Sequence, residues 1–172
     1  MDAAMGVVFV SGSPGETRAF GAELARLLPD GAVVALVGEL GAGKTVLVQG
    51  AAEGIGAGRG EGDDEGVTSP TFVLVKHHVG DSGRVLIHVD AYRLRGPSDL
   101  ADIGSDDFLG REGIAFVEWA DRVEAALPRP YLLVRVRHET TRSRRIELEG
   151  VGESSQALLE AAAKAAARSG AT

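Results

Sequence analysis

The sequence predicts an α/β fold in which a mixed, mainly parallel central sheet lies between two layers of helices, with one antiparallel hairpin. Short runs rich in valine and isoleucine alternate with stretches of helical periodicity along most of the chain, which is the pattern of this class. The run at residues 32–37 is apolar throughout, as expected of a strand covered on both faces. With 172 residues, of which 44% are hydrophobic and 25% charged, the chain is long enough to bury one core.

The N-terminal elements have clear start and stop signals. A β-branched run at residues 6–10 predicts the first strand. Ser13 stands at the N-cap position of the helix that follows, Pro14 stands at its first helical position, and the Pro-Asp-Gly sequence at 29–31 ends it. The strand at 32–37 then leads into a glycine-rich turn and a second helix at about residues 44–54.

The rest of the chain alternates strands, short helices and polar segments. The glycine-rich, acidic segment 54–66 has no apolar periodicity, which favours a mobile surface loop over a specific acidic docking site. An antiparallel hairpin is expected around the turn at 80–83. The expected elements that remain are strands at 72–79 and 85–89, one or two short helices at 97–108, a strand at 114–117, a short helix at 120–127, and a strand pair at 131–136 and 145–148.

The chain is expected to form one domain over residues 1–152, followed by an alanine-rich, loosely docked helical tail over 153–172. The formal net charge of −7 argues against a protein that grips nucleic acid mainly through counterion release. The absence of cysteine excludes disulfides, cysteine nucleophiles and thiolate metal sites. No apolar run approaches the ~20 residues that span a bilayer, and no signal peptide is evident, so we expect a cytoplasmic protein that does not enter membranes.

The strongest functional signal is the sequence GELGAGKT at residues 38–45, a complete G-x-x-x-x-G-K-T motif between a buried strand and a helix. In such a P-loop, glycines let successive backbone N–H groups point at phosphate oxygens, and the helix N-terminus adds its positive dipole end. Lys44 would neutralise the β- and γ-phosphates, and the Thr45 hydroxyl would bind Mg²⁺. The motif therefore predicts a P-loop NTPase-like three-layer sandwich. The expected nucleotide-binding residues of this segment are Gly41, Ala42, Gly43, Lys44, Thr45 and Val46.

A site of this kind also needs carboxylates that hold Mg²⁺ and order the attacking water. Asp90 and Glu118 each follow a short apolar strand, and ligands of open α/β sheets bind at the carboxyl ends of strands. Either acid alone could be a solvated strand end, but the pair fits a site that already has a P-loop. P-loop GTPases identify guanine with an Asn-Lys-x-Asp motif, and this chain contains no asparagine. ATP is therefore favoured over GTP.

Four segments together resemble a known family. They are the P-loop, the sequence VTSPTF at 67–72, the sequence HVDAYRL at 88–94 and the pair Glu118-Trp119. In this order they resemble the bacterial tRNA threonylcarbamoyladenosine biosynthesis ATPases, the TsaE (YjeE) family. The resemblance covers roughly residues 13–148. Many ATPases share the P-loop, whereas the other three segments are far more specific.

The resemblance implies a small Mg²⁺-dependent ATPase that serves N6-threonylcarbamoylation of adenosine 37 in tRNA. A protein of this family does not transfer the threonylcarbamoyl group itself. It joins the partner proteins TsaB and TsaD, meets tRNA through that complex, and uses ATP hydrolysis to reset the assembly between turnovers.

The resemblance also implies roles for individual residues. Lys44, Asp90 and Glu118 are the expected catalytic residues, and Thr45 and Glu118 are the expected Mg²⁺ ligands. Ser69 and Thr71 belong to a switch-like loop beside the γ-phosphate. Further positions near the nucleotide are Pro14, Thr17, Trp119 and Arg142. Trp119 could instead pack in the core, and a helix cap and a turn explain Pro14, Thr17 and Arg142 equally well.

Two other function classes remain open at this level. One is a nucleotide-gated binding module in which hydrolysis is not essential. The other is a P-loop kinase for a small molecule, which would need an arginine-rich lid. An arginine cluster does occur, and it could form the outward face of a strand pair or a surface that meets tRNA or a partner. Its members are Arg135, Arg137, Arg142, Arg144 and Arg145.

Overall fold

The computed structural model describes residues 6–57 and 75–170. They form a seven-stranded sheet in the order β1-β7-β6-β2-β5-β4-β3. The strands are β1 (Val7–Ser11), β2 (Val33–Val37), β3 (Val75–Val79), β4 (Val85–Asp90), β5 (Ile114–Glu118), β6 (Tyr131–His138) and β7 (Arg144–Val151).

The sheet is mixed and mainly parallel, which confirms the predicted class. Strand β2 pairs in parallel with both β5 and β6, and β4 pairs in parallel with β5. The pairs β3–β4, β6–β7 and β1–β7 are antiparallel. Strands β1, β2, β4, β5 and β6 therefore point one way, and β3 and β7 point the other way. The expected hairpin around residues 80–83 is the β3–β4 pair.

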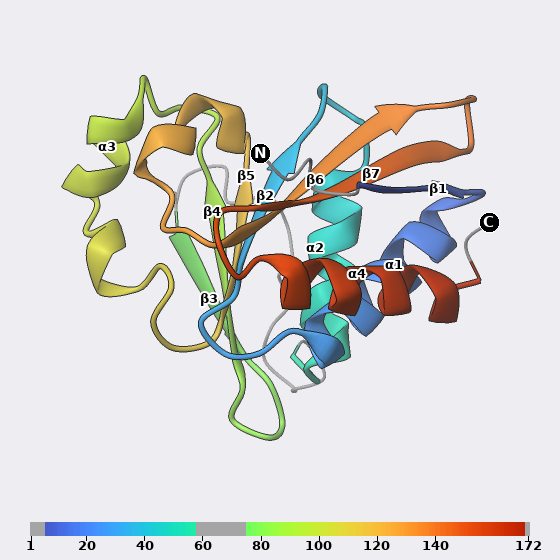
Figure 1. Cartoon of the computed structure of the whole chain (residues 1–172), viewed down its shortest axis with the longest axis horizontal. Helices are drawn as coiled ribbons and strands as arrows, with labels where there is room; N and C mark the ends of the chain where they lie inside the picture. The colour runs from blue at the N-terminus through green and yellow to red at the C-terminus, as the bar shows by residue number, and fades with distance from the viewer. Residues whose placement is uncertain (1–5, 58–74, 171–172) are drawn as a thin grey trace.

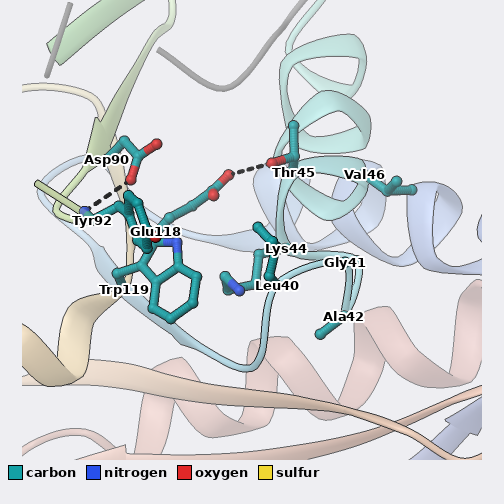
Figure 2. A pocket seen from close by; sticks show the side chains of 11 residues that line it. Leu40, Gly41, Ala42, Lys44, Thr45, Val46, Asp90, Tyr92, Glu118 and Trp119 are labelled. Atoms are coloured by element: carbon teal, nitrogen blue, oxygen red, sulfur yellow. Dashed lines mark hydrogen bonds between the residues drawn. The ribbon is translucent and has the colours of Figure 1, made fainter. Parts of the chain in front are cut away.

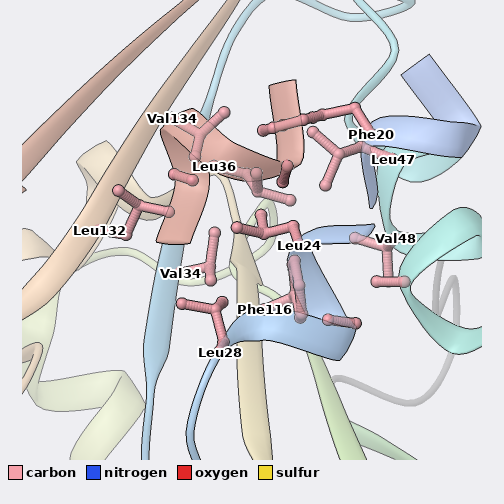
Figure 3. Packing of buried hydrophobic residues seen from close by; sticks show 14 of the residues in the cluster. Phe20, Leu24, Leu28, Val34, Leu36, Leu47, Val48, Phe116, Leu132 and Val134 are labelled. Carbon is pink, nitrogen blue, oxygen red and sulfur yellow. The ribbon is translucent and has the colours of Figure 1, made fainter. Parts of the chain in front are cut away.

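Helices cover both faces of the sheet, which gives the three predicted layers (Figure 1). One face carries α1 (Pro14–Leu27), α2 (Lys44–Gly54) and α4 (Gln156–Arg168). The other carries the short helix α3 (Pro97–Asp102) and three 3₁₀ turns, η1 (Ser105–Asp107), η2 (Ala120–Arg122) and η3 (Glu124–Ala126). Figure 3 shows the first layer interface, where Phe20 and Leu24 of α1 lie among Val34, Leu36 and Phe116 of the sheet.

Helix α1 begins as its sequence predicts. The Ser13 hydroxyl accepts a hydrogen bond from the backbone N–H of Glu16 at 3.2 Å, and Pro14 occupies the first turn. The Glu16 carboxylate in turn accepts the Gly12 N–H at 2.6 Å. Backbone donors at the helix start are thereby satisfied by side chains, which fixes where the helix begins.

The segment expected as one short helix at 120–127 is instead two 3₁₀ turns, η2 and η3. The backbone leaves the helical region at Val123, where φ is −129°. Ala120, Val123 and Leu127 are all buried against the second face of the sheet. A segment this short gains little from an α-helix of its own, so packing against the sheet decides its conformation.

The tail helix α4 is more closely packed than the sequence analysis expected. Leu158, Leu159 and Ala162 are buried, and they belong to the same apolar cluster as α1 and α2. Small alanine side chains on this face let α4 lie close against α1.

Of the expected loop at 54–66, residues 58–66 lie outside the described residues, as do Ser69, Thr71 and the first part of the strand expected from Phe72. No helix in the described part of the chain is long and apolar enough to cross a membrane.

Helices α1 and α2 touch through glycine. A Cβ added to Gly21 would overlap the backbone carbonyl of Leu47, and one added to Gly50 would overlap the carbonyl of Arg18. Backbone atoms cannot rotate away as a side chain can, so these positions exclude any larger residue. The close contact holds α2, and with it the P-loop at its start, against the rest of the fold.

We predict that Gly21→Ala destabilises the protein by about 2 kcal/mol or more through overpacking. For a domain of this size the melting temperature would fall by roughly 4–8 °C. Gly15→Ala is the matched control, because it lies in the same helix and its added Cβ would be 3.6 Å from the Ser13 hydroxyl, an ordinary contact. Thermal unfolding followed by circular dichroism measures both variants. Equal melting temperatures for the two would contradict the packing argument.

Candidate active site

A cavity of about 360 Å³ opens at the carboxyl ends of β2, β4 and β5 (Figure 2). The P-loop, which joins β2 to α2, forms one wall, and residues at and just after the ends of β4 and β5 form the other. This is the edge of the sheet where α/β proteins bind their ligands. The residues that line it are Leu40, Gly41, Ala42, Gly43, Lys44, Thr45, Val46, Asp90, Tyr92, Glu118 and Trp119.

The P-loop backbone is shaped to receive an anion. Gly41 and Gly43 have φ values of 76° and 112°, which side chains other than glycine rarely adopt. Helix α2 starts directly after Gly43, with no acidic residue in its first turn and no side-chain cap in the described structure. The first N–H groups of the helix are therefore left for an anionic ligand such as phosphate.

Lys44 places a buried ammonium group at this wall. Its side chain is only 5% exposed, and Nζ donates to the carbonyl oxygens of Gly38 and Glu39, the latter at 2.9 Å. The ammonium also lies 4.2 Å from the centre of the Trp119 ring, in reach of a cation–π contact. Burial lowers the pKa of Lys44, while the negative charges of Glu118, Asp121 and Asp90 oppose that shift.

Glu118 joins the two walls of the cavity. The Thr45 hydroxyl donates a hydrogen bond to its Oε1 at 2.9 Å (Figure 2). His88 Nε2 lies 3.0 Å from the same oxygen. Glu118 is 2% exposed, so these contacts offset part of the cost of burying its carboxylate.

These residues fit Mg²⁺ bound together with phosphate. A hydroxyl that donates its hydrogen to Glu118 keeps its lone pairs, and hydroxyl and carboxylate oxygens are ligands that Mg²⁺ accepts. The described residues contain no group of three or more histidine or acidic side chains that could hold a metal alone. Thr45 and Glu118 could therefore hold the ion only with phosphate oxygens or water as further ligands.

Asp90 reaches the same cavity from the neighbouring strand. In the parallel β4–β5 pair it stands directly opposite Glu118. Its Oδ1 accepts the backbone N–H of Tyr92 at 3.0 Å, which fixes one carboxylate oxygen and the turn that follows β4. The sequence placed both acids at strand ends, and the structure brings both to one cavity.

Two aromatic side chains, Tyr92 and Trp119, line one side of the cavity. The rings of Tyr92 and Trp119 lie 5.0 Å apart, and the Arg122 guanidinium stands 5.2 Å from the first ring and 5.7 Å from the second. Trp119 packs against the second apolar cluster and also lines the cavity, so packing in the core and a place at the cavity do not exclude each other. Its φ of 57° is unusual for a bulky residue and turns the chain sharply after Glu118.

Three predicted positions do not line this cavity. Pro14 and Thr17 lie at the start of α1, where the Thr17 hydroxyl is 2.7 Å from that of Ser11. Arg142 is exposed in the turn between β6 and β7, where its backbone N–H donates to the Thr140 hydroxyl. Ser69 and Thr71 lie outside the described residues.

Sequence reasoning missed the part played by Arg144. Its Nε donates to the carbonyl oxygen of Ala42 in the P-loop at 2.8 Å, and its Nη1 donates to the carbonyl oxygen of Ser143 at 3.0 Å. Arg144 stands opposite Ser11 in the β1–β7 pair. The contact therefore ties the P-loop to the start of β7, which lies beside the end of β1. The sequence signal was only the arginine cluster, which does not say which member turns toward the P-loop.

Comparison with known proteins gives one consistent family. The sequence model of "Threonylcarbamoyl adenosine biosynthesis protein TsaE" matches residues 11–146. A "tRNA threonylcarbamoyladenosine biosynthesis protein TsaE" from Bacillus subtilis is 35% identical over 148 residues, which are 86% of this chain and 88% of that protein. The protein of the same name from Streptomyces coelicolor is 44% identical over 122 residues, 69% of this chain and 77% of that protein.

A solved structure agrees with this result. The crystal structure of Bacillus subtilis YdiB superposes with a TM-score of 0.74 at 28% sequence identity. The match covers 95% of this chain and 98% of that chain. The P-loop NTPase-like fold predicted from the sequence is thereby confirmed.

We predict that Arg144→Ala loosens the P-loop. A hydrogen bond from a charged group contributes about 1.5–3 kcal/mol, so amide hydrogen exchange of the P-loop should become roughly 10- to 150-fold faster. Arg145→Ala is the matched control, because this neighbouring arginine is exposed and pairs with Glu147 instead. Exchange followed by mass spectrometry measures both. Equal exchange rates in the two variants would show that the Ala42 contact does not hold the loop.

Proposed function

The chain belongs to the TsaE family, whose proteins take part in tRNA threonylcarbamoyladenosine biosynthesis, and we propose that it is the Mg²⁺-dependent ATPase of that modification. It hydrolyses ATP to ADP and phosphate, and it acts on a partner complex of TsaB and TsaD instead of transferring the threonylcarbamoyl group itself. Its place of action is the cytoplasm, and tRNA meets it through the complex.

The observation that carries this proposal is the hydrogen bond between Thr45 and Glu118 inside the P-loop cavity. A glycine-rich turn with a chance lysine would not need a buried carboxylate held against the first turn of the next helix. A hydroxyl and a carboxylate at this place match the two protein ligands that P-loop enzymes offer to Mg²⁺. Lys44, buried beside them, matches the cation that meets the phosphates.

Hydrolysis then follows from positioning and charge. The amides at the start of α2 and the Lys44 ammonium hold the β- and γ-phosphates. Thr45 and Glu118 would hold Mg²⁺, and the bound ion would neutralise charge on the phosphate oxygens. Asp90 orients a water and accepts its proton while the water oxygen bonds to the γ-phosphorus. The bond from the γ-phosphorus to the bridging oxygen breaks, and its electrons leave with ADP. The hydrogen bond from the Tyr92 N–H to Oδ1 holds the Asp90 carboxylate in place at the cavity.

Action through a partner is supported by the surface around the cavity. Leu40 at the tip of the P-loop is 82% exposed and Tyr92 is 51% exposed, which leaves apolar surface at the mouth. Exposed apolar side chains at the mouth of one cavity offer a surface on which another protein could dock. Much of the arginine cluster is already engaged, because Arg135 pairs with Glu149 at 2.8 Å and Arg145 with Glu147 at 3.3 Å. Because these arginines already pair with acidic residues, we favour the interpretation that the cluster is the outward face of a strand pair. The alternatives, a surface that meets tRNA and the arginine-rich lid of a kinase, are less well supported.

The nucleotide-gated binding module remains the second candidate function. The same exposed Leu40 and Tyr92 favour it, since bound nucleotide would lie beside the apolar rim and could govern docking. In that case hydrolysis would not be required for tRNA modification.

The test of the proposal is ADP release from Mg·ATP by the purified protein, alone and with TsaB, TsaD and tRNA. We expect slow release alone and faster release in the mixture. Asp90→Asn should lower kcat by about 100-fold or more with ATP binding retained, because it removes a proton acceptor but keeps an oxygen for the Tyr92 N–H. Lys44→Ala serves as the control that fails to bind ATP, and Lys164→Ala, exposed on α4, as the control that behaves as the wild type.

The same mixture separates the two candidates. If Asp90→Asn supports full tRNA modification without hydrolysis, the binding module is the correct function and the ATPase proposal is wrong. Transfer of phosphate to a small acceptor instead of water would make the protein a kinase. Wild-type protein that neither binds nor hydrolyses ATP in any setting would refute both.

A further inference from the structure

His88 is a fully buried polar residue that the proposed hydrolysis does not use directly. It lies on β4 two residues before Asp90, so the alternation of a strand points both side chains to the same face of the sheet. Asp90 lines the cavity, whereas His88 lies deeper and is not part of the cavity wall. Its Nε2 lies 3.0 Å from Glu118 Oε1, the oxygen that also accepts the Thr45 hydroxyl.

We propose that His88 is a positioning residue that holds the Glu118 carboxylate in place for Mg²⁺ through a hydrogen bond from Nε2. This inference rests on the proposed function, because it concerns the metal-binding carboxylate of the same site. His88 does not contact the nucleotide or the metal in this account. It acts only through Glu118.

The contact fixes which ring nitrogen carries the hydrogen. An ionised carboxylate only accepts hydrogen bonds, so an unprotonated Nε2 at 3.0 Å would set two acceptors against each other. Nδ1 of His88 is buried and has no hydrogen-bond partner among the described residues. A hydrogen on Nδ1 would therefore be an unsatisfied buried donor, which native structures rarely tolerate. Both observations assign the hydrogen to Nε2.

His88 and Thr45 contact Glu118 from two different elements of the fold. Thr45 belongs to the first turn of α2, next to the P-loop, whereas His88 belongs to β4, an inner strand between β5 and β3. Both described hydrogen bonds reach Oε1, which leaves Oε2 of the carboxylate for the metal or its water. Without His88 the buried carboxylate would keep only one donor among residues 6–57 and 75–170, and that donor, Thr45, is itself a proposed metal ligand. A donor from the rigid sheet fixes the carboxylate whether or not the P-loop is occupied.

The test compares His88→Asn with His88→Gln. The amide nitrogen of glutamine is as many bonds from Cα as Nε2 of histidine, whereas that of asparagine is one bond closer and cannot reach Glu118. We measure ADP affinity by calorimetry with and without Mg²⁺. In His88→Asn, the factor by which Mg²⁺ increases the affinity for ADP should be about 10- to 100-fold smaller than in the wild type. The affinity for ADP without Mg²⁺ should be unchanged. His88→Gln should stay within about threefold of the wild type, and kcat should follow the same order with little change in KM for ATP.

Two results would overturn the inference. If His88→Asn keeps the wild-type gain from Mg²⁺, the ring only fills space. If the wild type itself binds ADP with no gain from Mg²⁺, the proposed function fails, and the inference fails with it. A measurement on the unchanged protein covers the case in which His88→Asn does not fold. Long-range ¹H–¹⁵N correlation spectra should show the hydrogen of His88 on Nε2, and a hydrogen on Nδ1 alone would also refute the proposal.

Discussion

The structure depends on bringing Thr45 to Glu118, two residues that are 73 positions apart in the chain. Their hydrogen bond forms because β5 lies beside β2 in the sheet, in a register that sets Leu36 opposite Glu118. Helix α2, which begins beside this strand end, is held by glycine contacts with α1. The contact between Thr45 and Glu118 therefore requires both this order of strands and this packing of the helices, and the cavity forms around that contact.

The apolar core supports a small group of buried polar side chains whose burial costs free energy. Both faces of β2 and β5 are buried, and the polar residues gather only at the ends of the strands. Lys44, His88 and Glu118 are each buried there and each makes contacts that satisfy them in part. Trp119 adds an unfavourable backbone conformation at the same place. Buried charge and strain concentrated at one site are typical of a site kept for function and supported by the surrounding fold.

Most of the fold, and the parts of the candidate site that lie within one segment, could be predicted from the sequence. The cap at Ser13, the P-loop and the acids Asp90 and Glu118 each depend on a few neighbouring residues. Contacts that depend on strand order could not be predicted, because a hydrogen bond from His88 to Glu118 requires β4 and β5 to be adjacent and in register. Arg144 reaches the P-loop across 102 positions, and the 3₁₀ turns after Trp119 follow the sheet surface instead of a local helical preference.

The measurement that tests this account most directly is a double-mutant cycle of Thr45→Val and Glu118→Gln on the gain in nucleotide affinity that Mg²⁺ provides. If the two side chains hold one ion together, each single change should remove most of the gain, and the double variant should lose little more than either one. Losses that simply add would mean that Thr45 and Glu118 act independently. That result would contradict the claim that their contact builds the site.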